Sequence, residues 1–140
     1  MTLENFFNIA NLTRRRDVFT VRQERIKREG SPYYNWNVPA TAAGAQSVIG
    51  VREEFPQARK YEPLDWIEVV NNEANNVLTL TINGTESFTV PAKSIRTIDN
   101  LALWHITITN NGGVITTLGN IRVTLQKQPM TIDKWAQRQR

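Results

Sequence analysis

Cysteine is absent from this chain of 140 residues, and histidine occurs once, as His105. Without cysteine, the chain can form neither a disulfide framework nor a thiolate metal site. A single histidine also excludes metal sites that need two or more imidazole ligands. Nucleophilic catalysis would then need a serine or threonine beside a base, and the sequence has no G-x-S-x-G motif. These absences predict a protein that is not an enzyme and that has no metal or cofactor.

Acidic residues also lack an arrangement typical of catalysis. Glycosidases need only two carboxyl groups, but these must face each other across a groove. The one acidic concentration surrounds the start of the first clear strand, where polar caps and edge charges are common; it contains Glu53, Glu54, Glu62, Asp65, Glu68 and Glu73. No matched acidic group is evident on another segment, and no Asp-x-Asp-x-Asp spacing indicates a calcium loop. We therefore expect these carboxylates to serve the fold.

Charge is sparse, at 21% of residues, with a formal net charge of +4. The only dense basic run is Arg14, Arg15 and Arg16, and Asp17 follows it at once. The next basic residues alternate with Glu24 and Glu29. Mixed signs of this kind are typical of solvated or salt-bridged segments. The sequence therefore argues against nucleic acid as a partner.

Long apolar runs are missing, so no segment reaches the length of a membrane span. Residues 1–10 also lack the basic region and apolar run of a signal peptide. We expect a soluble protein that is made in the cytoplasm and has no membrane partner. The polar residues are rich in Asn, Thr and Gln. Such side chains can be buried at an interface without an ionic desolvation penalty, although exposed strands and turns use the same residues.

The part of the chain that is most readily interpreted is residues 63–128, a series of short strands and turns. Four of the five residues at 66–70 are β-branched or aromatic, and residues 77–82 alternate leucine or isoleucine with valine or threonine. Asn83-Gly84 then indicates a hairpin. A two-residue loop would place Leu80 opposite a serine, whereas a three-residue loop places Leu80 opposite Phe88 and Leu78 opposite Val90. Because one register step moves every side chain to the other face, we predict the three-residue, bulged loop.

A second strand pair is predicted around residues 110–113, which read Asn-Asn-Gly-Gly. In residues 103–109 the apolar face is Trp104, Ile106 and Ile108, and His105 falls on the opposite, threonine-bearing face with Leu103. A four-residue loop at residues 110–113 would pair Ile108 with Ile115 on the next strand. Residues 114–126 then form either one long strand bent at Gly119 or two strands separated at Gly119-Asn120.

The apolar face of this sheet must be covered. Residues 17–22 and 47–52 are the candidates, and they would complete an all-β, antiparallel, jelly-roll-like sandwich of about eight strands. If these segments cover a neighbouring subunit instead, the domain is incomplete alone. We divide the chain into an N-terminal arm with one or two strands (residues 1–62), the core β domain (63–128) and a C-terminal tail or short helix (129–140).

The arm and tail carry the candidate interface residues. Phe6 and Phe7 lie in an apolar stretch that could form one or two helical turns, and Arg14, Arg15 and Arg16 follow it. Trp135 is the large apolar residue near the end of the tail, so we expect it to dock on this domain or a partner. Tyr33, Tyr34 and Trp36 form an aromatic cluster that could stack on single-stranded bases or on sugar rings. Packing or a protein interface explains the same residues, because aromatic side chains bury much area.

One stretch resembles a known class of proteins. The segments "TINGTESFTVPAKSIRTIDN", "WHITITNNGG" and "NIRVTL" resemble small β-sandwich structural proteins of tailed-bacteriophage virions, in which Val-Pro after a strand and Asn-Gly-Gly turns recur. The resemblance covers about residues 77–125 and transfers no specific functional residue. It implies a virion protein that decorates and stabilises a capsid surface, or alternatively a head–tail connector or tail accessory protein. The implied partners are the major capsid protein or another virion protein and further copies of the chain, with a trimer favoured.

Overall fold

The structure is a computed structural model, and it describes residue 21 and residues 24–129. Residues 24–29 are helical and belong to a unit of their own. There Arg25 Nε lies 3.1 Å from Glu29 Oε2, and the Gly30 amide donates to Ile26 O. Of the predicted strand at residues 17–22, only Val21 is described, and it is helical.

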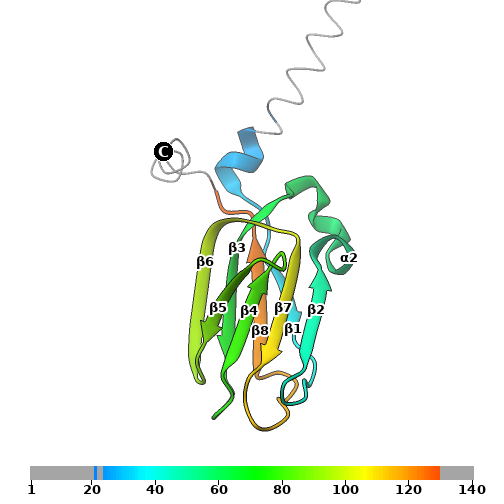
Figure 1. The fold of residues 1–140 in the computed structure, drawn as a ribbon. Helices are drawn as coiled ribbons and strands as arrows, with labels where there is room; N and C mark the ends of the chain where they lie inside the picture. The colour runs from blue at the N-terminus through cyan, green and yellow to red at the C-terminus, as the bar shows by residue number, and fades with distance from the viewer. Residues whose placement is uncertain (1–20, 22–23, 130–140) are drawn as a thin grey trace, which may run out of the picture. The chain divides into compact units, whose positions relative to one another are not determined.

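The second unit, Ser31–Gln128, contains all eight strands of the described residues (Figure 1). In chain order its elements are β1 (Tyr34–Asn37), β2 (Gln46–Gly50), α2 (Val51–Glu54), the 3-10 helix η1 (Pro56–Tyr61), β3 (Leu64–Asn71), β4 (Leu78–Ile82), β5 (Glu86–Val90), β6 (Ser94–Leu103), β7 (His105–Asn110) and β8 (Ile121–Gln126). Strands β1 and β2 come from the segment that precedes residue 62. They are joined to β3 by α2 and η1.

The strands form two antiparallel sheets of four, with orders β1-β8-β3-β6 and β2-β7-β4-β5. Their pairing is nested: β1 pairs with β8, β2 with β7, β3 with β6 and β4 with β5. The chain is therefore one long antiparallel hairpin wrapped into two layers, which is the jelly-roll arrangement. The expectation of an all-β, jelly-roll-like sandwich is confirmed. Of the predicted arm and tail, residues 1–20, 22–23 and 130–140 lie outside the described residues.

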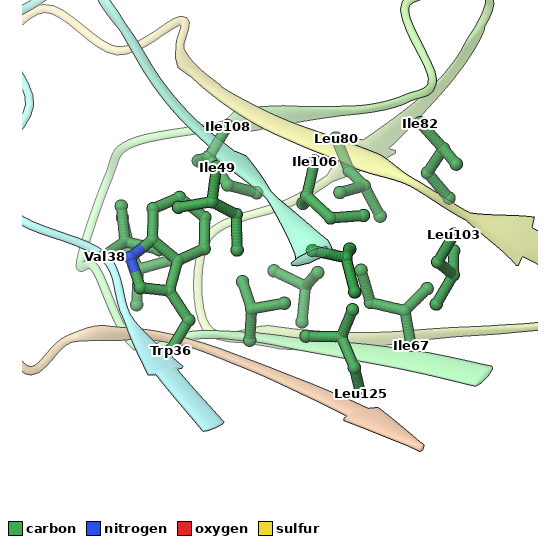
Figure 2. Close-up of a cluster of buried hydrophobic side chains, with 14 of the residues drawn as sticks. Trp36, Val38, Ile49, Ile67, Leu80, Ile82, Leu103, Ile106, Ile108 and Leu125 are labelled. Atoms are coloured by element: carbon green, nitrogen blue, oxygen red, sulfur yellow. The ribbon is translucent and has the colours of Figure 1, made fainter. Parts of the chain in front are cut away.

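The core lies between the two sheets, where side chains from both inner faces meet (Figure 2). In β4, Leu78, Leu80 and Ile82 are buried and the intervening threonines are not, as the period-2 pattern predicts. Burial of one such side chain contributes about 1.5–3 kcal/mol. The other fully enclosed aliphatic residues include Ile67, Val69, Leu103, Ile106, Ile108, Ile121, Val123 and Leu125.

The hairpin between β4 and β5 has the predicted register. Leu80 pairs with Phe88 and Leu78 with Val90, so the three-residue loop at residues 83–85 is confirmed. Asn83 and Gly84 both have positive φ angles, of 56° and 70°, and the Thr85 amide donates to Ile82 O at 3.1 Å. The Asn-Gly pair supplies the two left-handed residues that this loop requires.

The predicted pairing of Ile108 with Ile115 is wrong. Strand β7 ends at Asn110, and the chain then crosses to the other sheet, where β8 begins only at Ile121. Residues 114–118 are not in a strand, so neither version of the strand predicted at 114–126 is correct before residue 119. The reason is that the buried Asn110 side chain donates to Thr41 O, from a distant part of the sequence, and to Val114 O, and so turns the chain out of the sheet.

The predicted faces of residues 103–109 need a second correction. Ile106 and Ile108 are buried and His105 is exposed, as expected, but Leu103 is also buried and Trp104 is only half-buried. Trp104 lies at a corner between β6 and β7, where Asn83 Oδ1 accepts from the amides of Trp104 (2.9 Å) and His105 (3.1 Å). The alternation of buried and exposed side chains therefore shifts by one residue at this corner.

We predict that Ile67→Ala will lower the free energy of unfolding by about 2–5 kcal/mol, because Ile67 is fully enclosed and its truncation leaves a cavity. Ile95→Ala is the matched control, since Ile95 is 64% exposed on the edge strand β6 of the same sheet. Its effect should stay within about 0.5 kcal/mol. Urea unfolding of both variants measures the difference, and equal losses would contradict the core described here.

Candidate interaction surface

The structure places only some of the predicted interface residues. Phe6, Phe7, Arg14, Arg15, Arg16 and Trp135 all lie outside the described residues. The aromatic residues Tyr33, Tyr34 and Trp36 are described, and they lie at the start of the sandwich, in and just before β1.

The three aromatic side chains do not form one stacking surface, because alternate residues of a strand point to opposite faces. Trp36 is 7% exposed and packs in the core (Figure 2). Tyr34 is half-buried with its ring centroid 5.5 Å from that of Phe55, and burial, with a smaller effect from Tyr61, raises the pKa of the Tyr34 hydroxyl. Tyr33 is 60% exposed and meets Trp66 edge-on at 5.9 Å. Only Tyr33 and Trp66 are therefore left as an accessible aromatic pair.

The single histidine lies in an open depression of about 420 Å³, lined by Arg52, Glu53, Trp104 and His105. The Arg52 guanidinium carbon lies 5.3 Å from the centroid of the Trp104 ring, and Arg52 Nε donates to Glu62 Oε2 at 2.9 Å. These contacts tie α2 and η1 to the corner between β6 and β7. Glu62 Oε1 is buried and has no hydrogen-bond partner. The contacts of Arg52 join structural elements, and Glu53 is the carboxylate that lines the depression beside His105.

The acidic residues of the sandwich also support the fold. Asp65 Oδ1 accepts from the Gln128 amide at 2.8 Å, and Glu73 Oε1 accepts from the Thr117 amide at 2.6 Å. Residues 24–129 contain no group of three or more His, Cys, Asp or Glu side chains that could hold a metal ion. No described helix is long and apolar enough to cross a membrane.

Buried asparagines connect the loops at the end of the sandwich that lies opposite the depression at His105. Asn71 ends β3, and its Nδ2 donates to Asn76 O at 2.9 Å and Pro91 O at 3.1 Å, while its Oδ1 accepts from the Glu73 amide at 3.0 Å. Asn110 ends β7 in the other sheet, and it bonds Thr41 O, Val114 O and the Gly112 amide. One asparagine from each sheet therefore connects the loops that meet at this end.

The loop between β7 and β8 is braced along its length. Thr41 and Thr116 exchange two hydrogen bonds, from the Thr116 amide to Thr41 O and from the Thr41 amide to Thr116 Oγ1. Asn76 Nδ2 donates to Val114 O at 3.2 Å. A Cβ atom at Gly112 would lie 1.9 Å from Asn76 Oδ1, so this position accepts only glycine without a shift of Asn76. Figure 1 shows this loop beside the β1–β2 loop.

The braced loop exposes aliphatic side chains. Val114, Ile115 and Leu118 are 62%, 60% and 65% exposed, and Val77, next to Asn76, is 37% exposed. We call these four residues the apolar end surface. The sequence did not predict the apolar end surface, because Val114 and Ile115 continue the alternating pattern of a core strand. The sequence does contain one indication of this surface. Asparagine is denser around residues 71–76 and 110–111 than a turn requires, which indicates side chains that hold a loop in place.

No protein-family model matches this chain, and a search of curated protein sequences finds no match.

We predict that Asn110→Ala will lower the free energy of unfolding by about 3 kcal/mol, since it removes three hydrogen bonds, to Thr41 O, Val114 O and the Gly112 amide, of about 1 kcal/mol each. Asn37→Ala, at an exposed position of β1, should change it by less than about 0.5 kcal/mol. Urea unfolding gives both values. Hydrogen exchange at the Thr116 amide should also accelerate in Asn110→Ala, and protection equal to that of the unaltered chain would contradict the bracing role.

Proposed function

We propose that this chain is a non-enzymatic structural protein of a virus particle, which binds and stabilises a capsid surface as a decoration protein. The observation that carries the proposal is the nested strand pairing of the jelly roll. Jelly rolls occur in viral capsid domains, and also in lectins and cupins. The inference is one of analogy between folds, because a fold alone does not determine an activity.

The construction of the sandwich supports the same proposal. Its polar side chains at both ends, Asn83 and Arg52 at one and Asn71 and Asn110 at the other, connect loops to strands. Such groups make a rigid body, and a rigid body is suited to a role in an assembly. Binding to the capsid surface would fall to the arm and tail, through Phe6, Phe7, the Arg14 to Arg16 run and Trp135. Two attachment segments on one body raise avidity without a large contact on either.

A head–tail connector or tail accessory protein would use the same construction, and it differs only in the virion surface that it meets. A carbohydrate-binding module is a second candidate, and the exposed Tyr33 beside Trp66 favours it. In that case polysaccharide should change the tryptophan fluorescence of the chain and Tyr33→Ala should abolish the change. Trp36 is unsuited to this test because it is buried in the core.

The test of the decoration role uses particles assembled without this protein. Purified full-length chain should co-sediment with them and should raise the temperature at which they release their genome. Trp135→Ala should weaken binding by about 2 kcal/mol, or about 30-fold in Kd, because a large aromatic anchor at an interface contributes about that much.

Two comparisons make the result decisive. Ile95→Ala, which truncates an exposed residue of the sandwich, should bind as the unaltered chain does. Binding of the unaltered chain to no virion component would overturn the proposal. Binding to isolated connector or tail structures with none to capsids would replace the decoration role with the connector or accessory role.

A further inference from the structure

The outer face of the sheet β1-β8-β3-β6 carries aromatic and polar side chains in an ordered arrangement (Figure 1). Antiparallel partners point to the same face, so the strand register sorts these side chains into rows that cross the strands. From the start of β3 the rows are Gln126–Trp66–Asp99, Asn35–Thr124–Glu68–Thr97 and Asn37–Arg122–Val70–Ile95. Neighbouring rows lie two residues apart along a strand, or about 6.6 Å.

Two aromatic rings lie at the first row. Tyr33, one residue before β1, is 60% exposed, and the centroid of its ring lies 5.9 Å from that of Trp66 with 64° between the ring planes. The Gln126 side chain of the same row is buried and donates to Ser31 O at 2.9 Å. We call Tyr33 and Trp66 the aromatic ledge. The ledge is held by these contacts before any ligand arrives, so binding to it orders few side chains.

The second row places hydrogen-bonding groups beside the ledge. Thr124 Oγ1 donates to Asn35 Oδ1 at 2.8 Å, which fixes the Asn35 carboxamide and leaves its Nδ2 as a donor. Within the part of the chain that the structure describes, the Glu68 carboxylate forms no hydrogen bond or ion pair. Each ring therefore has a polar group two positions along its own strand, Asn35 after Tyr33 and Glu68 after Trp66.

A ring with a polar group beside it is complementary to a sugar residue. A pyranose has a face of C–H groups and a rim of hydroxyl groups. The C–H face packs on the electron-rich face of an aromatic ring. The hydroxyl groups can accept from a carboxamide and donate to a carboxylate, and both of these groups are present in the second row. Two rings, each with its polar group, match two successive sugars of a chain that lies across the strands.

The charges of the face argue against other macromolecules. The three rows contain two carboxylates, on Asp99 and Glu68, and one guanidinium, on Arg122. The carboxylates flank Trp66, so nucleic acids and acidic polysaccharides are repelled near the ledge. A carboxylate in the middle of the face also argues against a protein partner, because the centres of protein interfaces are poor in charged residues. An uncharged polyol avoids both difficulties.

The inclination of the rings identifies the physical form of the ligand. Because the ring planes of Tyr33 and Trp66 differ by 64°, the two rings cannot both lie flat on one surface of a crystalline polymer. A single soluble chain can rotate successive sugars about their linkages and so meet both rings.

We propose that the aromatic ledge and the second row bind a soluble, uncharged polysaccharide, with one sugar at Tyr33 and Asn35 and the next at Trp66 and Glu68. The proposal rests on the carbohydrate-binding candidate, and it adds the polar residues, the direction of the chain across the strands and the class of polysaccharide. It is independent of the decoration role, because the proposed capsid contacts lie in the arm and tail.

The test titrates the full-length chain with soluble polysaccharides and follows tryptophan fluorescence. At least one of laminarin, soluble xylan and galactomannan should bind saturably. Alginate, which is acidic, and microcrystalline cellulose, in a pull-down, should bind at least about tenfold more weakly. Tyr33→Ala and Glu68→Ala should each raise the Kd for the soluble probe at least about tenfold, since one removes a stacking contact and the other a charge-assisted hydrogen bond.

Matched controls lie on the other sheet. Val48 is as exposed as Tyr33, at 60% each, and Glu86 is an exposed glutamate on the edge strand β5. Val48→Ala and Glu86→Ala should bind the probe as the unaltered chain does. Circular dichroism checks that each variant is folded, and Glu68→Gln, which keeps the size of the side chain, replaces Glu68→Ala if the latter is unfolded.

Several results would overturn the proposal. They are the absence of saturable binding to all three soluble probes, binding to alginate or microcrystalline cellulose as tight as to the soluble probes, and binding that Tyr33→Ala leaves unchanged. Binding that is lost in Tyr33→Ala but kept in folded Glu68 variants would overturn the role of the second row and leave the carbohydrate-binding candidate in place. A chain that binds no probe but still co-sediments with virus particles would remove this proposal and keep the decoration role.

Discussion

Two buried carboxamides, on Asn71 and Asn110, determine how one end of this sandwich is built. Each ends a strand, one in either sheet, and each is enclosed where water cannot replace its hydrogen bonds. A carboxamide can donate and accept at once, so one side chain can bond several loop backbones. Neither aspartate, which donates nothing when ionised, nor an aliphatic residue could do so. The route of the chain from β7 to β8 and the outward orientation of Val114 and Ile115 both depend on these bonds.

The opposite end is connected by different chemistry. There Arg52 lies over Trp104 and bonds Glu62, and Asn83 bonds the backbone of the corner between β6 and β7. The Arg52–Glu62 ion pair of this end is partly exposed, whereas Asn71 and Asn110 at the other end are buried and neutral. The sandwich is therefore asymmetric along its length, with a partly exposed ion pair at one end and exposed aliphatic side chains at the other. An asymmetry of this kind orients a protein in an assembly, because the two ends cannot exchange partners.

The sequence predicted those features that depend on local alternation. Strands β3, β4 and β5 and the register of the loop at residues 83–85 follow from period-2 burial and from the left-handed angles that Asn83 and Gly84 accept. The all-β sandwich followed from the number of such strands. The loop after β7 could not be predicted in this way. Residues 114–118 have the alternation of a strand, and they leave the sheet only because Asn110, Asn76 and Thr41, distant from each other in sequence, meet there. The aromatic residues at 33–36 could not be assigned to a face from the sequence either. Tyr33 is exposed and Trp36 is buried, and this separation depends on where β1 begins.

The nested pairing of strands also has a consequence for how the protein is made. Tyr34 pairs with Leu125, near the other end of the sandwich sequence, and every residue of β1 has its partner in β8. Of the eight described strands a ribosome releases β1 first and β8 last, so β1 has no sheet neighbour until β8 has been made. Closing so long a loop costs entropy before any contact is gained, which makes such topologies slow to fold. During that delay the inward-facing side chain of Trp36 has nothing to cover it. The same nesting that closes the finished sandwich therefore leaves an apolar side chain exposed in the nascent chain until the last strand of the sheet has been made.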